Sequence, residues 1–355
     1  MPIESDCYLA GRSFPAELRR RLDNYFTERK LSQKANAEMA TKIAAGFALW
    51  FGSYLSLYVF QPDSWKLVLD YLVLGIAHLY FLFNIAHDGI HYAISRKRSI
   101  NILFSYGYEF CGVNSYLARA LHNRAHHACI NIDGEDDPLS GRGVFRYTPF
   151  ARKKAMHRFQ HLYVPFLYAL VSLDYIFVRD FADFFSPTQE CLKRAKPPAR
   201  EYVILFAGKI LYLALTILLP IFVLGRSPLL ILTAFLLMHF IVGLGVAAVF
   251  GPTHIVDSSY FPESRGEFGD YIYHIFATTT DFATRSTLVT FATGGLNHHI
   301  VHHICPYVCH THYPQLTEIV KRTAAEYHVQ YMEEPTMASA LVSHVALLKR
   351  LATEP

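Results

Sequence analysis

Six cysteines occur among the 355 residues, and they form no pair of CxxC motifs, the spacing typical of cysteine-based zinc sites. The chain also has no internal repeat and no low-complexity tract. Its net charge of +4 requires only attraction to a cytoplasmic membrane surface and gives no indication of nucleic-acid binding. Because the first forty residues are polar and charged, we expect no secretory signal peptide before the first apolar segment. The cysteines should then be reduced thiols, and packing is the expected role of Cys305 and Cys309.

Long apolar segments, by contrast, are abundant, and 52% of the residues are hydrophobic. A helix that crosses a membrane needs about 20 predominantly apolar residues. Two pairs of segments reach or approach that length, and only a short turn separates the members of each pair. The expected spans are residues 43–60, 67–86, 203–224 and 228–250. The sequence therefore predicts an all-α integral membrane protein that contains two helical hairpins.

The basic residues predict how these hairpins are oriented. The turns at 61–66 and 225–228 carry almost no Lys or Arg. The basic segments are the N-terminal arm, Arg96-Lys97-Arg98 and the stretches near 142–158 and 193–200. By the positive-inside rule, these segments face the cytoplasm. The apolar stretch 162–178 is interrupted by Pro165 and Asp174, so we expect it to be interfacial or buried and not to cross.

This orientation divides the chain into a small number of parts. We expect a cytoplasmic N-terminal arm (residues 1–40) and one membrane domain (41–355). Two parts of that domain, 87–202 and 251–355, should form a helical cap on the cytoplasmic side. Because both hairpins leave and return on one side, the histidine-rich motifs of the chain should all lie there.

Three histidine clusters lie near the ends of the apolar segments: His87-Asp-Gly-Ile-His91, His122-Asn-Arg-Ala-His126-His127 and His299-Ile-Val-His302-His303. Residues three or four apart share one face of a helix, so each cluster can direct two imidazoles to one point. Histidine is a common metal ligand and is costly to bury in a membrane protein, which suggests one shared polynuclear site. Two ions with three to five nitrogens each fit the count, and imidazoles suit iron, copper, zinc or nickel. The candidate ligands, with His254 after the second hairpin as a ninth, are His87, His91, His122, His126, His127, His254, His299, His302 and His303.

The other histidines have simpler expected roles. His78 and His239 lie within apolar spans and should be packed and hydrogen-bonded. The sequence leaves open whether His298 or His299 points toward the metals. The remaining candidates for packing or for support behind the ligands are His157, His161, His310 and His312.

The order HxxxH, HxxxHH and HxxHH, combined with two membrane hairpins, resembles the membrane fatty acid desaturase superfamily. Further motifs resemble its bacterial acyl-CoA, or linoleoyl-CoA-like, desaturase branch. They are Phe14-Pro15, Ala35-Asn36-Ala37, Asn131-Ile132-Asp133-Gly134-Glu135-Asp136-Asp137, His157-Arg158-Phe159-Gln160-His161, Gly294-Gly295-Leu296-Asn297 and Cys309-His310-Thr311-His312-Tyr313-Pro314. The resemblance covers nearly the whole chain.

This resemblance implies that the nine histidines hold two non-haem iron ions, which activate O2 and remove two hydrogens from an acyl chain. It implies a CoA or acyl-carrier-protein thioester as the substrate, an apolar tunnel between the hairpins, and membrane lipid around the protein. Because we expect no fused cytochrome b5 module, electrons would come from a separate ferredoxin or cytochrome b5. The candidates to orient ligand imidazoles through their second nitrogens are Asp88, Asp133, Asp257 and Asn297.

The third cluster departs from the pattern of the close branch. That branch usually has glutamine where His299 stands, an acidic residue where Val301 stands, and Leu-Phe-Pro in place of Ile304-Cys305-Pro306. The reaction type is therefore open within the superfamily, and an acetylenase or hydroxylase acting on a carrier-protein-linked chain is the alternative. A haem-binding membrane cytochrome and a zinc-dependent membrane hydrolase are alternatives from other classes.

Overall fold

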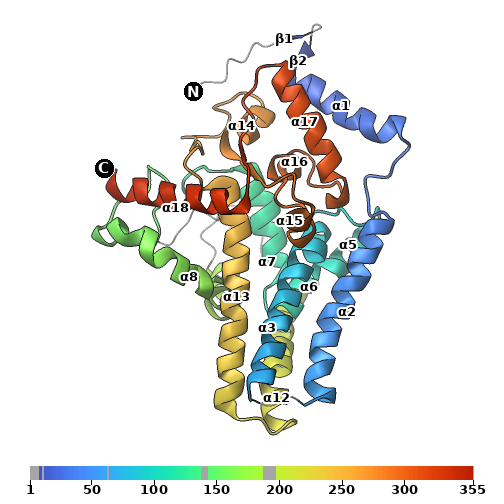
Figure 1. The fold of residues 1–355 in the computed structure, drawn as a ribbon, viewed down its shortest axis with the longest axis vertical. Coiled ribbons are helices and arrows are strands. Elements are labelled where there is room, and N and C mark those ends of the chain that lie inside the picture. The colour runs from blue at the N-terminus through green and yellow to red at the C-terminus, as the bar shows by residue number, and fades with distance from the viewer. Residues whose placement is uncertain (1–7, 10–11, 62–63, 137–142, 187–196, 355) are drawn as a thin grey trace.

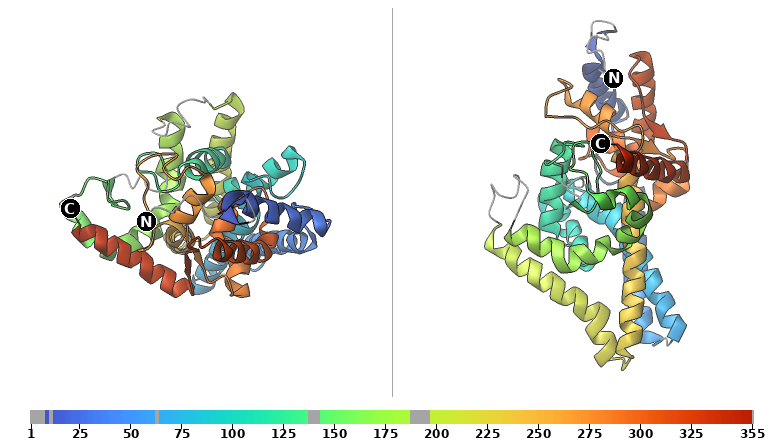
Figure 2. Two further views of the ribbon diagram at one scale, coloured as in Figure 1. Left: turned by 90° about the horizontal axis from the view of Figure 1, so that it is seen from above. Right: turned by 90° about the vertical axis from the view of Figure 1, so that its left-hand side faces the viewer.

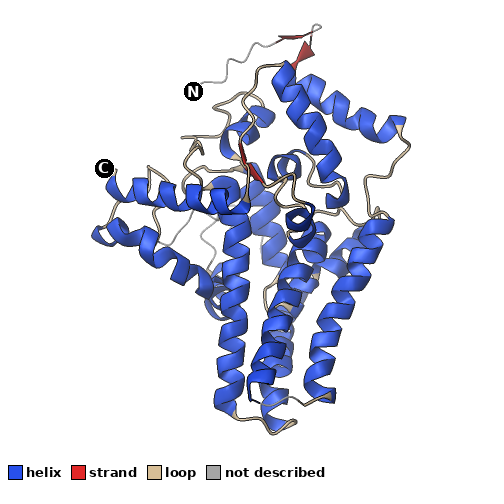
Figure 3. Ribbon diagram, viewed as in Figure 1, coloured by secondary structure: helices blue, strands red, loops and turns tan. Residues whose placement is uncertain are grey.

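The structure, a computed structural model, describes residues 8–9, 12–61, 64–136, 143–186 and 197–354. It is almost entirely helical (Figure 3). The described strands are two residues long: β1 (Tyr8–Leu9) pairs antiparallel with β2 (Arg12–Ser13), and β3 (Asp281–Phe282) pairs parallel with β4 (Glu333–Glu334). Parts of the expected N-terminal arm and of the basic stretches near 142–158 and 193–200 lie outside the described residues.

Long helices form the lower half of the molecule (Figure 1). α3 continues through a π-turn, η1, into α4, so one continuous helix reaches the first histidine cluster. α11 leans away from α13 and approaches it at the lower turn (Figure 2, right). The elements of this half are α2 (Ala37–Val59), α3 (Ser64–Phe81), η1 (Leu82–Ala86), α4 (His87–Ile90), α11 (Ala199–Leu213), η7 (Ala214–Leu218), α12 (Leu219–Phe222) and α13 (Pro228–His254).

By length and composition, four helices can cross a membrane, which confirms the all-α membrane architecture: Ser64–Ile90, Ala155–Phe185, Ala199–Phe222 and Pro228–His254. Three of them correspond to the spans expected at 67–86, 203–224 and 228–250. The span expected at 43–60 is not in this set, because the Gly, Ser, Tyr and Trp residues of α2 make that helix less apolar. α2 nevertheless packs along α3 in the bundle.

The helical stretch Ala155–Phe185 was expected to be interfacial or buried, yet it is long and apolar enough to cross. Neither interruption ends the helix: Pro165 lies inside α8 (Gln160–Asp174), and Asp174 leads into the π-turn η6 (Tyr175–Arg179). In Figure 1, α8 is strongly inclined to α13 and lies near its upper end, beside α18 (Met337–Thr353). α8 approaches α13 closely at Gly243, where a Cβ atom would overlap the backbone carbonyls of α8.

The upper half is the helical cap (Figure 1). α1 (Phe14–Glu28) packs against α17 (Tyr313–Glu326), and the ring of Phe14 contacts those of Tyr273, Phe276 and Tyr327. The remaining short helices are α5 (Arg98–Ser105), α6 (Gly107–Phe110), α7 (Ser115–Ala120), η2 (Leu121–Ala125), η3 (His126–Ala128), η5 (Ala155–Phe159), α9 (Asp180–Phe185), α14 (Tyr271–Thr278), α15 (Thr287–Ala292), α16 (His299–Ile304) and η8 (His310–His312). Because α4 and α13 both end under this cap, the histidine clusters meet there.

Candidate metal centre

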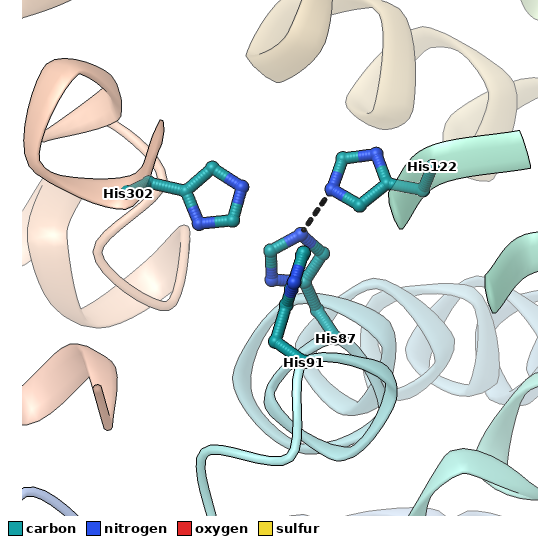
Figure 4. Close-up of side chains that lie close together, drawn as sticks. All are labelled: His87, His91, His122 and His302. Atoms are coloured by element: carbon teal, nitrogen blue, oxygen red, sulfur yellow. Dashed lines mark hydrogen bonds between the residues drawn. The ribbon is translucent and has the colours of Figure 1, made fainter. Parts of the chain in front are cut away.

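The nine candidate ligands, although far apart in the sequence, meet between the bundle and the cap. They form two sets, and within each set the ring nitrogens lie within 4.8 Å of one another. The first histidine group consists of His87, His91, His122 and His302, whose rings come from three segments and face one another (Figure 4). The second histidine group consists of His126, His254, His299 and His303. His127 lies between the groups, because its nitrogen is within the same distance of those of His302 and His303.

The separations between ring nitrogens match those of ligands around a shared ion. Nε2 of His127 lies 3.2 Å from Nε2 of His122 and 3.1 Å from Nε2 of His302. Two imidazole nitrogens bound at right angles to one ion, with bonds of about 2.1 Å, would be roughly 3.0 Å apart. In addition, Nε2 of His91 and Nε2 of His299 are buried without a hydrogen-bond partner among the described residues. Buried polar atoms are rarely left unpaired, and a metal ion would satisfy both nitrogens.

Two π-turns position the first and second clusters. η1 directly precedes His87, and η2 directly precedes His126. A π-turn has i→i+5 hydrogen bonds and is frequent at functional sites, since it changes the direction of the side chains that follow. His87 and His91 lie beyond η1 and stay in one group, as their spacing predicts. His122 lies within the π-turn η2 and His126 directly after it, and they belong to different groups, so the prediction that they share one point was wrong.

The third cluster is held by the turn that precedes it. Gly294 (φ 60°) and Gly295 (φ 73°) have the left-handed conformation that favours glycine. A Cβ atom at Gly294 would overlap the backbone carbonyl of Phe83, so this turn packs directly on η1. At the start of α16, Asp281 Oδ1 accepts the backbone N–H of Ile300 at 2.7 Å. The π-turn before the first cluster and the turn before the third therefore form one unit.

Burial favours the neutral form of six of these histidines. It lowers the pKa values well below their usual range, and repulsion from neighbouring histidines adds to the effect; outside the spanning helices this holds for His91, His122, His127, His299, His302 and His303. A neutral imidazole has a free lone pair on one nitrogen, which is the form that binds metals. These imidazoles can therefore offer lone pairs to a metal cation without repelling it by a positive charge of their own.

The second ring nitrogens are held by groups that no spacing in the sequence indicated. Nδ1–H of His126 donates to Asp136 Oδ1 at 2.9 Å. Nδ1–H of His254 donates to the carbonyl of Thr278 (3.1 Å), and Nδ1–H of His299 to that of Leu296 (3.0 Å). Such bonds fix the tautomer that leaves Nε2 free for a metal. Asp136 lies in one of the motifs that carry the resemblance, and this was the only signal that could have found it.

The four residues predicted to orient ligands have other partners. Asp88 accepts hydrogen bonds from His310, and Asp133 accepts one from the Thr148 hydroxyl at 3.0 Å. Asp257 forms an ion pair with Arg350 at 3.0 Å, and Asn297 contacts Thr290, Thr293 and the carbonyl of Ala283. Among the described residues, none of the four hydrogen-bonds one of the nine histidines, so the predicted direct contacts do not form. Proximity to a ligand in the sequence did not set the direction of these side chains.

The remaining histidines resolve the choices that the sequence left open. His298 belongs to neither histidine group, and its Nδ1 lies 2.8 Å from the Thr317 hydroxyl and its Nε2 3.1 Å from that of Thr290. His239 contacts Ser172 and Tyr212 inside the bundle. His78 donates to the carbonyl of Leu74 at 2.6 Å. Neither His78 nor His239 belongs to the histidine groups, which confirms their expected role as packed residues.

A cavity of about 520 Å³ lies beside the centre. His87, His122, His126 and His254 form part of its wall. Most of the other wall residues are apolar and come from η1, η2, α8 and α13, for example Leu82, Leu121, Leu170 and Val246. The cavity therefore contains the apolar space that was expected between the hairpins, and a hydrocarbon chain placed there would lie against both histidine groups.

Comparison with known proteins agrees with this geometry. A model of the family described as fatty acid desaturase matches residues 63–335. The chain is 32% identical over 353 residues to the sn-1 linoleoyl-lipid 6-desaturase of Synechocystis sp., with 96% of each chain covered. It is 30% identical to the protein of the same name from Arthrospira platensis, with 96% of this chain and 93% of the relative covered. Identity to the acyl-lipid (8-3)-desaturase of Physcomitrium patens is also 30%, with 96% of this chain and 72% of the relative covered.

Proposed function

Because this chain belongs to the fatty acid desaturase family, we propose that its nine histidines hold two non-haem iron ions and that it inserts a double bond into an acyl chain, with O2 as the oxidant. The observation that supports this proposal is the pair of histidine groups that both reach the wall of an apolar cavity. A hydrocarbon chain needs apolar walls, and its C–H bonds need a strong oxidant beside them.

The donor set fits iron. Each group offers four imidazole nitrogens, and His127 offers one more between them. Imidazole suits iron, and a centre of this kind differs from the Glu-rich di-iron sites of soluble helical bundles. When bound, the irons supply the O2 activation that removal of hydrogen from an unactivated carbon requires.

The residues of the chain supply the positions and the exclusion of water. Leu121, Leu170 and Val246 wall the space where the acyl chain would lie, and Asp136 fixes the tautomer of His126. The balance of the reaction requires an outside donor: two hydrogens from the acyl chain, together with two electrons and two protons, reduce O2 to two waters. We propose a ferredoxin or cytochrome b5 as that donor, and the basic cytoplasmic face as its approach.

The relatives bear on the carrier of the acyl chain. The names of the Synechocystis sp. and Physcomitrium patens proteins specify lipid-linked acyl chains. We therefore favour a chain attached to a membrane lipid over the expected CoA or carrier-protein thioester. In this arrangement the histidine groups lie on the cytoplasmic side, and the acyl chain is drawn from the bilayer into the cavity.

The test is expression in a host of known lipid composition, followed by mass spectrometry of the acyl chains in each lipid class and in the CoA and carrier-protein pools. We expect a new double bond that appears first in the glycerolipids. A triple bond or a hydroxyl group would instead support the acetylenase or hydroxylase alternative.

Two variants and two physical measurements serve as controls. His126→Ala removes a ligand and should abolish the product, whereas His78→Ala alters a packed residue outside the groups and should leave most of it. A haem Soret band in the purified protein would contradict the di-iron proposal. Zinc as the sole bound metal, with turnover that persists without O2 and reductant, would support a hydrolase instead.

A further inference from the structure

A polar cluster behind the first histidine group has no part in the proposed chemistry. Asp88, Cys309 and His310 are buried and bring their ligand atoms within 4.8 Å of one another, which by itself suggests a third metal site. However, both ring nitrogens of His310 are already used. Nδ1–H donates to Asp88 Oδ2 at 3.0 Å, and Nε2 accepts from Lys42 Nζ at 2.8 Å. The cation of this cluster is therefore the Lys42 ammonium group and not a metal.

Lys42 is a buried charge in an otherwise largely apolar helix. Its side chain is 4% exposed, and it lies on α2 opposite the carboxylate of Asp88, with the ring of His310 between them. The backbone N–H of His310 also donates to Asp88 Oδ2, at 3.3 Å. Removing one partner of a buried pair leaves the other charge uncompensated, which strongly destabilises that local arrangement. The lysine therefore holds Asp88, and with it the turn of chain that carries His87.

The segment before Lys42 bridges the same two parts of the chain a second time. Lys34 Nζ donates to the carbonyls of Tyr92 and Tyr307, both at 2.9 Å. The backbone does the same: Ala35 N–H donates to the Ile94 carbonyl at 3.1 Å, and Cys309 N–H to the Gln33 carbonyl at 2.9 Å. We call residues 33–42 the N-terminal strap. It ties the turn after the first histidine cluster to the segment after the third.

Both of the bridged parts support the first histidine group. Asp88 directly follows His87 in the sequence. Tyr313, three residues after His310, places its hydroxyl 3.3 Å from Nδ1 of His302. The second group has different supports, since His126 is held by Asp136 and His254 by the carbonyl of Thr278. The contacts that hold His126 and His254 thus do not involve the segment 33–42.

We propose that the N-terminal strap is a positioning device for the first histidine group, and that Lys42 and His310 are positioning residues that set the affinity of this group for its metal ion. This inference rests on the proposed function, because it requires the histidines to bind metal. It assigns a role to a segment that the sequence presented only as the end of a polar arm and the beginning of a span.

The test compares iron content and the rate of iron release to a chelator in detergent-purified protein. The wild type should hold two irons per chain. Lys42→Met should retain its fold, as judged by circular dichroism and gel filtration, and hold about one. Asp136→Asn should weaken the other ion, so the double variant should lose both. Lys349→Met, which removes an exposed lysine on α18, should match the wild type.

His310 provides a graded version of the same experiment. His310→Gln keeps one donor and one acceptor, so it should retain more of the first ion than His310→Ala. Replacement of iron by Co(II) adds a spectroscopic readout, because the d–d bands of the two sites should be lost separately in Lys42→Met and in Asp136→Asn.

The outcomes separate this inference from the function on which it rests. Two irons with wild-type release rates in folded Lys42→Met, or equal loss of both ions, would overturn the inference and leave the proposed function intact. A wild-type chain that binds no iron would overturn the proposed function itself. If Lys42→Met does not fold, Lys34→Met replaces it: faster release of one ion supports the inference, and unchanged release overturns it.

Discussion

His299 shows what a single side chain contributes to this centre. Its Nδ1–H donates to the carbonyl of Leu296, which fixes the ring, and its Nε2 is buried and faces the other members of the second group. The neighbouring His298 has the same chemistry but is bonded to two threonine hydroxyls instead. The function of a histidine here therefore depends on the partners of its two ring nitrogens. His299 keeps Nε2 available for a metal ion, whereas both nitrogens of His298 are hydrogen-bonded.

Substitution of His299 should consequently depend on whether the new side chain can still coordinate. His299→Ala should lower turnover by at least ~100-fold, the upper end of what the loss of a supporting partner costs at a metal site. His299→Gln should retain more activity and more iron, because an amide oxygen can replace the nitrogen. Product analysis and iron content measure both effects, with His298→Gln as the control for the pair. Equal losses in His299→Ala and His299→Gln would contradict this role.

At the scale of single residues, the sequence predicted which residue types form the site better than it predicted which way each side chain points. All nine candidate ligands converge. Imidazoles are costly to bury beside apolar spans unless they bind a shared group such as a metal ion. The choice between His298 and His299, and the role of Asp136, could not be predicted. These depend on Thr290, Thr317 and the fold of residues 131–136, which are not part of any spacing rule.

Among the elements, the turn at Gly294–Gly295 is the contact that joins two of the histidine clusters. Gly294→Ala places a methyl group against the carbonyl of Phe83 in η1, and it also puts alanine at a φ of 60°. The left-handed conformation alone costs about 1–2 kcal/mol. The overlap adds to this cost and displaces η1, so we expect a lower unfolding temperature together with loss of iron.

Gly225→Ala is the matched control for that substitution. Gly225 also has a φ of 60°, but nothing lies within 4 Å of its Cβ position. It should show the conformational cost in thermal unfolding without any loss of iron. If both variants lose iron to the same extent, the contact between the turn and η1 does not position the clusters.

The elements also show where a prediction from sequence is weakest. The apolar segments gave three of the four long apolar helices, because run length is a direct signal of a span. The π-turns η1 and η2 could not be predicted, since they arise from packing around the centre and not from a local motif. For the same reason, i,i+4 spacing assigned His122 and His126 to one point and was wrong.

On the scale of the whole molecule, charged groups stabilise helix α1 internally and, through Arg21 and Glu326, join it to the cap. Arg20 and Arg21 hydrogen-bond Glu17 and lower its pKa to about 2, and Arg21 also pairs with Glu326 at 2.5 Å. A carboxylate with a lowered pKa stabilises the fold above its unfolded-state pKa near 4.5, and this stabilisation disappears as the pH falls toward 2. Limited proteolysis between pH 5 and pH 2.5 should therefore cleave progressively faster near α1.

The variant Glu17→Gln removes the titrating group and tests the cause of that pH dependence. It should cleave faster than the wild type at pH 5, and its cleavage should change less as the pH falls. If the wild type and the variant show the same pH profile, other carboxylates control the pH dependence of cleavage near α1.

The convergence of the histidines constrains which helices can cross a membrane. His91 and His254 lie at one centre, so the chain between them must cross the membrane an even number of times. Ala199–Phe222 and Pro228–His254 are long and apolar enough to supply two crossings as a hairpin. We therefore predict that Ala155–Phe185 does not cross completely, despite its length, and the inclined position of α8 in Figure 1 is consistent with this prediction.

The even number of crossings leads to a prediction about the protein in an intact membrane. Tags at the two termini should both be cytoplasmic, and an epitope inserted in the turn at 225–228 should be accessible only from the opposite side. The basic N-terminal arm sets the direction by the positive-inside rule. Agreement between the ends requires an even number of crossings after His91 and also that α2 and α3 cross as a pair, as their packing side by side suggests. Protease protection in sealed, oriented vesicles measures all three positions. Termini on opposite sides would mean that Ala155–Phe185 crosses, and three histidine clusters could not then share one metal centre.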